Sequence, residues 1–426
     1  MVEIQIALQL SFKYLFLCIF FTINIDMTII TTPIISQNPY GNYQVGNTKY
    51  PNKMEAAYRA TQEKLPITWD FHNAEFSKIN WQQRPPGNIQ DLYRQRAQQL
   101  RDTYDYIIVY FSGGSDSWTV LNSFLSNGIH VDEIRTNWAM DQRKFQAADP
   151  TNRHEVNIMS EFEYAILPVL DHVRKTYPRT NIVINDYSTA LQKENFDEEL
   201  IHRSNHWQNI SSPYRLKGTS EKSDLLINRH RSVAGVYGFE KLKMRCVNKK
   251  LYAFFSDTAG GAELDGEKAV EFFFSTPKFS LIPVMQAHYL RDELLAQKAQ
   301  AMANKNSNAP GLRDRGLWND IYLRACYPDY NPDTFQTDKA LGTWLRASDV
   351  WMHKYNPTFF DSWRWTYDQY FKNLDDNLLD KMQGTITVGL KALNSPNYLI
   401  DDNFDYPDFV ASSKLNLFGA TGQKEY

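Results

Sequence analysis

Short apolar runs alternate with amphipathic segments through the middle of this 426-residue chain. Residues 107–111 (IIVYF) form a continuous apolar run, which is typical of a strand buried on both faces of a parallel sheet. From residue 116 apolar positions recur at helical spacing, and Gly128 is placed to end that helix. The same alternation predicts strands at 131–138, 181–185 and 232–238 and a long helix at 153–175. Strands that alternate with helices predict an α/β fold, with a parallel sheet covered by helices on both faces.

The turn between the first strand and its helix has the sequence SGGSDS, residues 112–117. Gly113 and Gly114 allow backbone angles closed to other residues and let a ligand come close to the main chain. Because a helix N-terminus carries unpaired N–H groups and a partial positive charge, the turn is predicted to hold an anion. Three hydroxyl groups would be additional donors, those of Ser112, Ser115 and Ser117. Asp116 would repel an anion unless a cation lay between them, so we expect it to hold Mg²⁺ against phosphates.

This segment resembles the SGGxDS signature of the PP-loop ATP pyrophosphatases, which include asparagine, GMP and argininosuccinate synthetases, tRNA-thiolating enzymes and PAPS reductases. The resemblance implies a HUP/Rossmann-like domain, ATP and Mg²⁺ as ligands, and cleavage of ATP between its α- and β-phosphates. The loop would hold the pyrophosphate portion while a substrate oxygen attacks the α-phosphorus. The alternative is a serine-rich turn that binds nothing.

Two further positions are candidates for the same crevice. The second strand ends at Thr136, Asn137 and Trp138, and ligands of such sheets lie beyond the carboxyl ends of the strands. In a family member adenine would lie there, so we take Asn137 as a nucleotide contact. The alternative is an ordinary strand end.

A basic hairpin is predicted after the fourth strand. In residues 241–246 (KLKMRC) strand alternation puts three cations on one face, and 247–250 turn the chain into a second strand at 251–255. If the hairpin lies over the crevice, Lys241 and Arg245 can neutralise the charge of the departing pyrophosphate. If it faces outward, it is a solvated basic face. Lys241 also resembles the lysine that follows this strand in several PP-loop ligases.

The chain is longer than one compact domain needs, so we expect additions on both sides of a PP-loop domain at 104–290. Residues 27–103 are predicted to hold a turn-rich arm at 33–50, a helix that begins after Asn88, and aromatic segments that either pack or cover a groove. Residues 291–426 are predicted to form a helical domain that closes the crevice and selects the second substrate. Its helices are expected at 291–305, 341–355 and 359–382, and another helix begins near Ile282.

The first 26 residues differ in character from the rest, because residues 4–25 are strongly apolar. A signal peptide, a membrane anchor and translation that begins at Met27 are the three interpretations. We favour the start at Met27, since the sequence after it is that of an ordinary soluble protein.

Composition limits the partners and the compartment. The formal charge is −3, from 46 basic and 49 acidic residues, so electrostatics give no support for binding to nucleic acid. Cys18, Cys246 and Cys326 are isolated, which implies neither a disulfide framework nor a metal cluster and fits a reducing cytoplasm. The order of segments is similar to that of asparagine-synthetase-like proteins encoded by tailed bacteriophages, in which case the compartment is the host cytoplasm.

The positions of the cysteines also indicate which reaction of the PP-loop superfamily to expect. Glutamine hydrolysis by asparagine synthetases needs an N-terminal cysteine, and neither Val2 nor Thr28 provides one. We therefore expect a ligase that adenylates a carboxylate or carbonyl oxygen of a small or macromolecular acceptor, for later attack by an amine. The alternatives are a PAPS-reductase-like or thiolation enzyme, and a nucleotide-binding module without turnover.

Overall fold

The computed structural model describes residues 41–50, 56, 59–60, 62–138, 140–141, 161–186, 188, 232–239, 241–257, 269–298, 314–331, 393–411 and 415–416. The apolar segment 4–25 and Met27 lie outside the described residues, as do the helices predicted at 341–355 and 359–382. Among the described helices, none combines the length and the apolar character needed to cross a bilayer.

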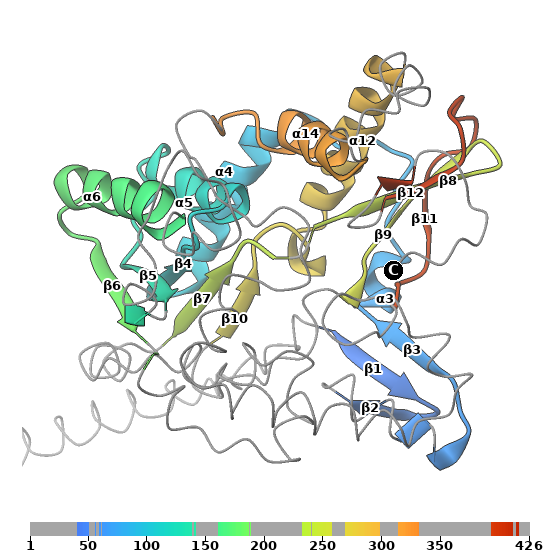
Figure 1. Cartoon of the computed structure of the whole chain (residues 1–426), viewed down its shortest axis with the longest axis horizontal. Coiled ribbons are helices and arrows are strands. Elements are labelled where there is room, and N and C mark those ends of the chain that lie inside the picture. Colours follow the sequence, from blue (N-terminus) through green and yellow to red (C-terminus); the bar gives the residue numbers. More distant parts are fainter. Residues whose placement is uncertain are drawn as a thin grey trace, which may run out of the picture. The chain divides into compact units, whose positions relative to one another are not determined.

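A five-stranded parallel sheet, in the order β6-β5-β4-β7-β10, carries the predicted turn (Figure 1). The strands are β4 (Tyr106–Tyr110), β5 (Glu133–Trp138), β6 (Asn181–Asp186), β7 (Val233–Tyr237) and β10 (Ala269–Phe272). All five side chains of β4 are buried, as its continuous apolar run requires for a strand in the middle of a sheet. The predicted parallel α/β sheet is confirmed.

The order of the strands creates a reversal beside β4. The chain passes from β4 outward to β5 and β6, then crosses back so that β7 and β10 lie on the other side of β4. This order is compatible with a Rossmann-like fold, in which ligands bind beyond the carboxyl ends of the strands where the order reverses. The SGGSDS turn follows β4, and Gly238 follows β7, so the two strands at the reversal lead into the predicted site.

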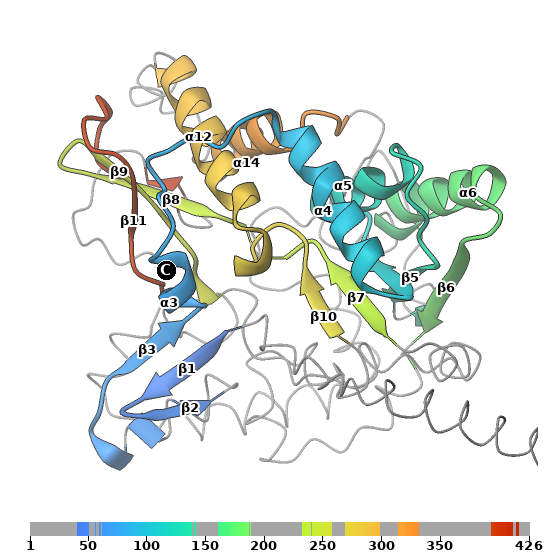
Figure 2. The ribbon, with the colours of Figure 1, turned by 180° about the vertical axis from the view of Figure 1, so that it is seen from behind.

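Helices flank this sheet. They are α4 (Ile89–Thr103), α5 (Ser115–Leu125) and α6 (Leu167–Thr176), the last preceded by a π-helical turn, η2 (Glu161–Ile166). Asn88 caps α4 as predicted, because its side-chain oxygen accepts from the N–H of Asp91 at 2.8 Å. Helices α4 and α5 pack together and both contact β4 (Figure 2). Of the helix predicted at 153–175, residues 153–160 lie outside the described residues.

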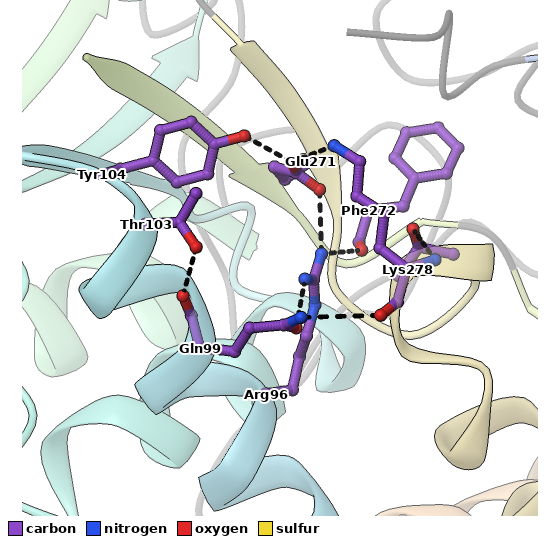
Figure 3. Close-up of polar contacts among 8 residues, drawn as sticks. Arg96, Gln99, Thr103, Tyr104, Glu271, Phe272 and Lys278 are labelled. Atoms are coloured by element: carbon purple, nitrogen blue, oxygen red, sulfur yellow. Dashed lines mark hydrogen bonds and ion pairs between the residues drawn. The ribbon is translucent and has the colours of Figure 1, made fainter. Parts of the chain in front are cut away.

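A buried ion pair fastens α4 to the edge strand β10 (Figure 3). The Nη2 group of Arg96 donates to Oε2 of Glu271 at 2.9 Å and to the carbonyl oxygen of Phe272 at 3.0 Å. The other carboxylate oxygen of Glu271 accepts from the hydroxyl of Tyr104 at 2.5 Å and from the Nζ of Lys278 at 2.7 Å. Burial alone would raise the pKa of Glu271, but the cations of Arg96 and Lys278 hold it below its usual value. The charge of Glu271 is thus matched inside the fold.

The predicted basic hairpin is confirmed as β8 (Lys243–Val247) and β9 (Lys250–Phe254). Met244 and Cys246 are buried and their neighbours are half-buried, as strand alternation predicts. Asn248 and Lys249 connect the strands at φ of +52° and +58°, the left-handed conformation of a two-residue hairpin turn.

The hairpin belongs to a second five-stranded sheet, in the order β11-β9-β8-β12-β13. The added strands are β11 (Tyr398–Asp401), β12 (Phe409–Ala411) and β13 (Leu415–Asn416), and the sheet is antiparallel throughout. The prediction of a helical domain over 291–426 is therefore wrong at these three strands. Such short strands are stabilised by partners about 150 residues earlier in the chain, so their local pattern carries little signal.

Two described helices lie between the hairpin and these strands in the sequence. One helix, α12 (Leu281–Ala296), covers both the helix start predicted near Ile282 and the first residues of the helix predicted at 291–305. It follows a 3₁₀ turn, η4 (Pro277–Phe279). Helix α14 (Asp314–Cys326) packs against α12.

The predicted N-terminal arm forms a small sheet where it is described. Strands β1 (Asn42–Val45), β2 (Thr48–Tyr50) and β3 (Ile67–Asp70) are antiparallel, and the short helix α3 (Asn73–Phe76) follows. The aromatic residues of this region are buried: Trp69, Phe71, Phe76 and Trp81. The rings of Phe71 and Phe76 lie 4.8 and 4.9 Å from that of Phe255, which directly follows β9. These aromatic side chains pack in the core rather than cover a groove.

Candidate functional site

The SGGSDS turn is a tight loop between β4 and α5. Gly113 has a φ of +78°, and a Cβ built there would lie 2.8 Å from the Cγ1 of Ile166, so both conformation and space require glycine. Gly114 stands at the N-cap of α5 with a φ of −81° and a ψ of 164°, an extended conformation that any residue adopts, so the prediction of special backbone angles is wrong for Gly114. No side-chain hydrogen bond caps this end of the helix. The first turn of α5 therefore has the arrangement that binds anions at helix N-termini.

The serines of the turn have different surroundings. The Oγ of Ser117 accepts from the backbone N–H of Ser112 at 3.1 Å and donates to the carbonyl oxygen of Gly114 at 3.1 Å. Ser117 is buried, whereas Ser112 is exposed and Ser115 is half-buried. Ser117 thus holds the loop closed on itself, and the expected ligand donors at the surface are the hydroxyls of Ser112 and Ser115.

Asp116, in the first turn of α5, accepts two contacts on a single carboxylate oxygen. The Nζ of Lys241 lies 3.0 Å from its Oδ1, and the hydroxyl of Tyr327 donates to the same atom at 2.5 Å. The Asp116 and Lys241 side chains are 24% and 38% exposed, so solvent reaches the pair. Two residues that the sequence nominated separately, on motifs more than 100 positions apart, are therefore in direct contact.

The glycine at the exit of β7 explains how these motifs meet. A Cβ at Gly238 would lie 2.9 Å from the carbonyl carbon of Asp116, closer than side-chain atoms normally approach. Gly238 thus lets the chain after β7 run directly against the first turn of α5. Lys241 follows three residues later, within reach of the carboxylate.

Tyr327 is the member of this group that sequence analysis missed. It follows α14, comes from the C-terminal part of the chain, and is 1% exposed. Burial and the neighbouring Asp116 carboxylate raise its pKa well above the usual value, so it stays protonated and donates its hydrogen. The surrounding sequence, ACYP, carries no local pattern that marks the tyrosine.

The structure does not bring Arg245 to the turn. Its guanidinium carbon lies 4.1 Å from the centre of the Phe254 ring, a cation–π contact within the second sheet. Burial lowers the pKa of Arg245. Within the described part of the chain it forms no hydrogen bond or ion pair with residues 112–117. Of the two predicted cations, only Lys241 is therefore in contact with the turn.

Asn137 lies at the carboxyl end of β5, as predicted. It pairs with Asn185 of β6, whose Nδ2 donates to the Oδ1 of Asn137 at 3.0 Å. The two amides are therefore held at the same edge of the sheet as the turn. Its predicted contact with adenine stays a prediction.

Asp116 fits a magnesium ion that is bound mainly through phosphate. Among the described residues, no cluster of three or more His, Cys, Asp or Glu could hold a metal by protein ligands alone. Mg²⁺ is commonly bound by one or two carboxylates together with substrate phosphates, and a single accessible carboxylate beside an anion-binding turn meets that requirement. We therefore keep Asp116 as the metal ligand of the proposed site.

The two described cysteines have the surroundings of inert thiols. Cys246 and Cys326 are both buried. Burial raises the pKa of Cys246 to about 11 and that of Cys326 well above its usual value. Since the thiolate is the reactive form, neither is poised for sulfur chemistry.

Comparison of the chain with protein-family models, with curated proteins and with solved structures gave no match. What the site does is therefore argued from its geometry and from the motif.

Proposed function

We propose that this protein binds ATP with Mg²⁺ at residues 112–117 and cleaves it between the α- and β-phosphates. The observation that carries the proposal is the contact of Asp116 and Lys241 at the reversal of strand order, beside an uncapped helix N-terminus. Cleavage of a nucleoside triphosphate needs a turn that binds the phosphates, a carboxylate for the metal and a cation that can reach the phosphates. The candidates are the 112–117 turn, Asp116 and the partly exposed Lys241.

The proposed reaction has two steps. A carboxylate or carbonyl oxygen of the acceptor attacks the α-phosphorus, the bond to the oxygen that bridges to the β-phosphorus breaks, and pyrophosphate leaves. An amine then attacks the activated carbon, AMP leaves with the oxygen, and the amine loses a proton. When bound, Mg²⁺ would neutralise charge on the phosphate oxygens.

Lys241 has a defined part in this scheme. In the structure the ammonium group of Lys241 lies 3.0 Å from the Asp116 carboxylate and balances its charge. A metal ion on the carboxylate would repel the ammonium group, which is 38% exposed and on a flexible stem. Lys241 would then turn to the phosphates and stabilise the charge of the departing pyrophosphate.

Within the described part of the chain both cysteines, Cys246 and Cys326, are buried, which favours this adenylating reaction over a sulfur-transfer reaction at either of them, because such a reaction needs an accessible thiolate. A nucleotide-binding module without turnover is the second candidate. The partly exposed Asp116–Lys241 pair would serve either one.

The test uses the purified full-length chain. ATP affinity is measured by calorimetry with and without Mg²⁺, and pyrophosphate release is measured by a coupled assay with pools of small carboxylic acids and ammonia. We expect micromolar to millimolar affinity for Mg·ATP and acid-dependent release of pyrophosphate. Binding without release in every pool would favour the module without turnover, and no binding of ATP would reject the proposed function.

Two variants place the activity at the turn. Asp116→Ala should reduce Mg²⁺-dependent release to background while the far-UV circular dichroism spectrum and a cooperative thermal transition are kept, because the side chain is partly exposed and serves the cation. Gly114→Val should eliminate ATP binding, since it adds a side chain where the phosphates would lie. Wild-type release by the purified Asp116→Ala protein would show that the assayed activity has another origin.

A further inference from the structure

Three segments of the chain meet at Asp116, and one of them has no role in the scheme above. Asp116 belongs to α5, Lys241 follows β7, and Tyr327 follows α14. Tyr327 donates to the same carboxylate oxygen that Lys241 contacts, at 2.5 Å, and its side chain is buried. A buried tyrosine hydroxyl on a partly exposed carboxylate constrains the direction in which that carboxylate points.

The surroundings of Tyr327 hold it in place. The hydroxyl of Tyr93, on α4, donates to the carbonyl oxygen of Cys326 at 2.7 Å, and Gln286 of α12 donates to that hydroxyl at 3.0 Å. The Tyr327 ring lies 5.4 Å from the Phe274 ring, which follows β10. The segment that ends α14 is thus fixed to two helices, and Tyr327 has little freedom to turn away from Asp116.

Tyr327 also lies beside the cation of the pair. The Nζ of Lys241 is 5.9 Å from the centre of the Tyr327 ring, within the range of a cation–π contact. The hydroxyl and the ring therefore act on different members of the pair. Replacing tyrosine by phenylalanine removes the first contact and keeps the second.

We propose that Tyr327 is a positioning residue that orients the Asp116 carboxylate for the metal–phosphate ligand, which makes the C-terminal segment 314–331 part of the site. This inference rests on the proposed function, because it assumes that Asp116 receives a metal-bound nucleotide. The rings of Tyr322 and Tyr327 both lie beside the Nζ of Lys241, at 5.3 and 5.9 Å.

The experiment compares Tyr327→Phe with Tyr330→Phe in the full-length chain. Tyr330 lies in the same segment, and its ring is 5.7 Å from that of Trp118 on α5, whereas the hydroxyl that donates to Asp116 is that of Tyr327. ATP affinity is measured by calorimetry across a Mg²⁺ titration and again in the presence of EDTA. For Tyr327→Phe we expect the half-saturating Mg²⁺ concentration to rise by about tenfold, with the metal-free affinity for ATP unchanged. Tyr330→Phe should match the wild type in both measurements.

An equal loss of affinity with and without Mg²⁺, or the same loss in Tyr330→Phe, would mean that the segment acts only through packing and would overturn the proposal. A further control compares Asp116→Asn with the double variant that also carries Tyr327→Phe. The two proteins should give the same Mg²⁺ titration.

A second measurement separates this inference from the proposed function. Urea midpoints of the wild type, Tyr327→Phe, Asp116→Ala and the double variant form a double-mutant cycle without ligand, because alanine removes the oxygen that accepts from Tyr327. We expect the two single shifts to sum to more than the shift of the double variant. If the wild type binds no Mg·ATP, the proposed function is wrong and so is the metal-positioning role. The cycle then reports whether the hydroxyl and the carboxylate are coupled, and additive shifts would reject the contact itself.

Discussion

Two carboxylates in this protein have similar partners and opposite surroundings. Glu271 accepts from a tyrosine hydroxyl at 2.5 Å and from a lysine at 2.7 Å, and Asp116 accepts from a tyrosine hydroxyl at 2.5 Å and lies 3.0 Å from a lysine. Glu271 is 4% exposed and has a third partner in Arg96, whereas Asp116 is 24% exposed and pairs with no arginine among the described residues. A carboxylate with a tyrosine and a lysine as partners thus occurs at a buried position, Glu271, and at a partly exposed one, Asp116.

The difference in exposure determines whether a carboxylate can exchange its cation for another at low cost. A buried charge that loses its partner is left unsolvated, so Glu271 and Arg96 are held together for as long as the chain is folded. A pair that water reaches contributes little to stability, and its members separate at low cost. Glu271 is therefore suited to fasten α4 to β10, and Asp116 is suited to receive a metal in place of Lys241.

The largest effect that this comparison predicts is on stability. Arg96→Met should lower the free energy of unfolding by about 3–5 kcal/mol, because it leaves the buried Glu271 carboxylate without its arginine. Lys241→Met, the matched change at the exposed pair, should alter it by less than about 1 kcal/mol. Urea unfolding of both variants, followed by circular dichroism, measures the difference. Equal losses in the two variants would show that the two ion pairs are not of different kinds.

The next effect concerns turnover and sharpens the comparison at the surface pair. Lys241→Met keeps the apolar stem and removes the charge, so pyrophosphate release should fall by about 10²-fold while ground-state ATP affinity changes little. Arg245→Met is the matched control, because Arg245 lies over Phe254 and not at the turn. It should cost less than about tenfold. The coupled assay measures pyrophosphate release by both variants, and calorimetry measures their ATP affinity. A larger loss of pyrophosphate release in Arg245→Met than in Lys241→Met would reverse the assignment of the catalytic cation.

The smallest effect is the pH dependence of the buried pair. The pKa of Glu271 is lower in the folded chain than its ordinary value of 4.5, so the folded state binds fewer protons at this site than the unfolded state. The stability that this carboxylate adds is therefore fully present above about pH 4.5 and is lost as the pH falls through the folded pKa. In urea unfolding between pH 3 and 7, the wild type and Glu271→Gln should differ most at neutral pH and converge in acid. A gap that widened toward low pH would contradict this sign.

The sequence predicted the elements whose signal is local. The apolar run before SGGSDS, the helix after it, the cap at Asn88 and the basic hairpin were all expected at or near their observed positions. Each depends on side chains that are neighbours in the chain, through burial on a strand, periodicity on a helix or a turn between strands. For the same reason Asp116 and Lys241 could be nominated from their own motifs.

Contacts between distant segments were not predictable in this way. The pairing of β11 with β9 and of β12 with β8 joins strands about 150 residues apart, and β11 and β12 are too short to stand out by themselves. Arg245 was grouped with Lys241 because strand alternation gives them one face, but the second sheet places its guanidinium against Phe254. Alternation indicates which side chains share a face and not what that face packs against.

The sequence by itself determined that a glycine turn and the start of a helix follow a buried parallel strand, because the apolar run, the glycine pair and the helical spacing are all local signals. Only the tertiary structure decided that Lys241 and Tyr327 converge on Asp116. That convergence depends on the strand order that sets β7 beside β4, on the close approach at Gly238, and on the docking of α14 against α12. Each of these contacts joins residues that are far apart in the chain. They depend on the packing of the whole core, so no single motif predicts them.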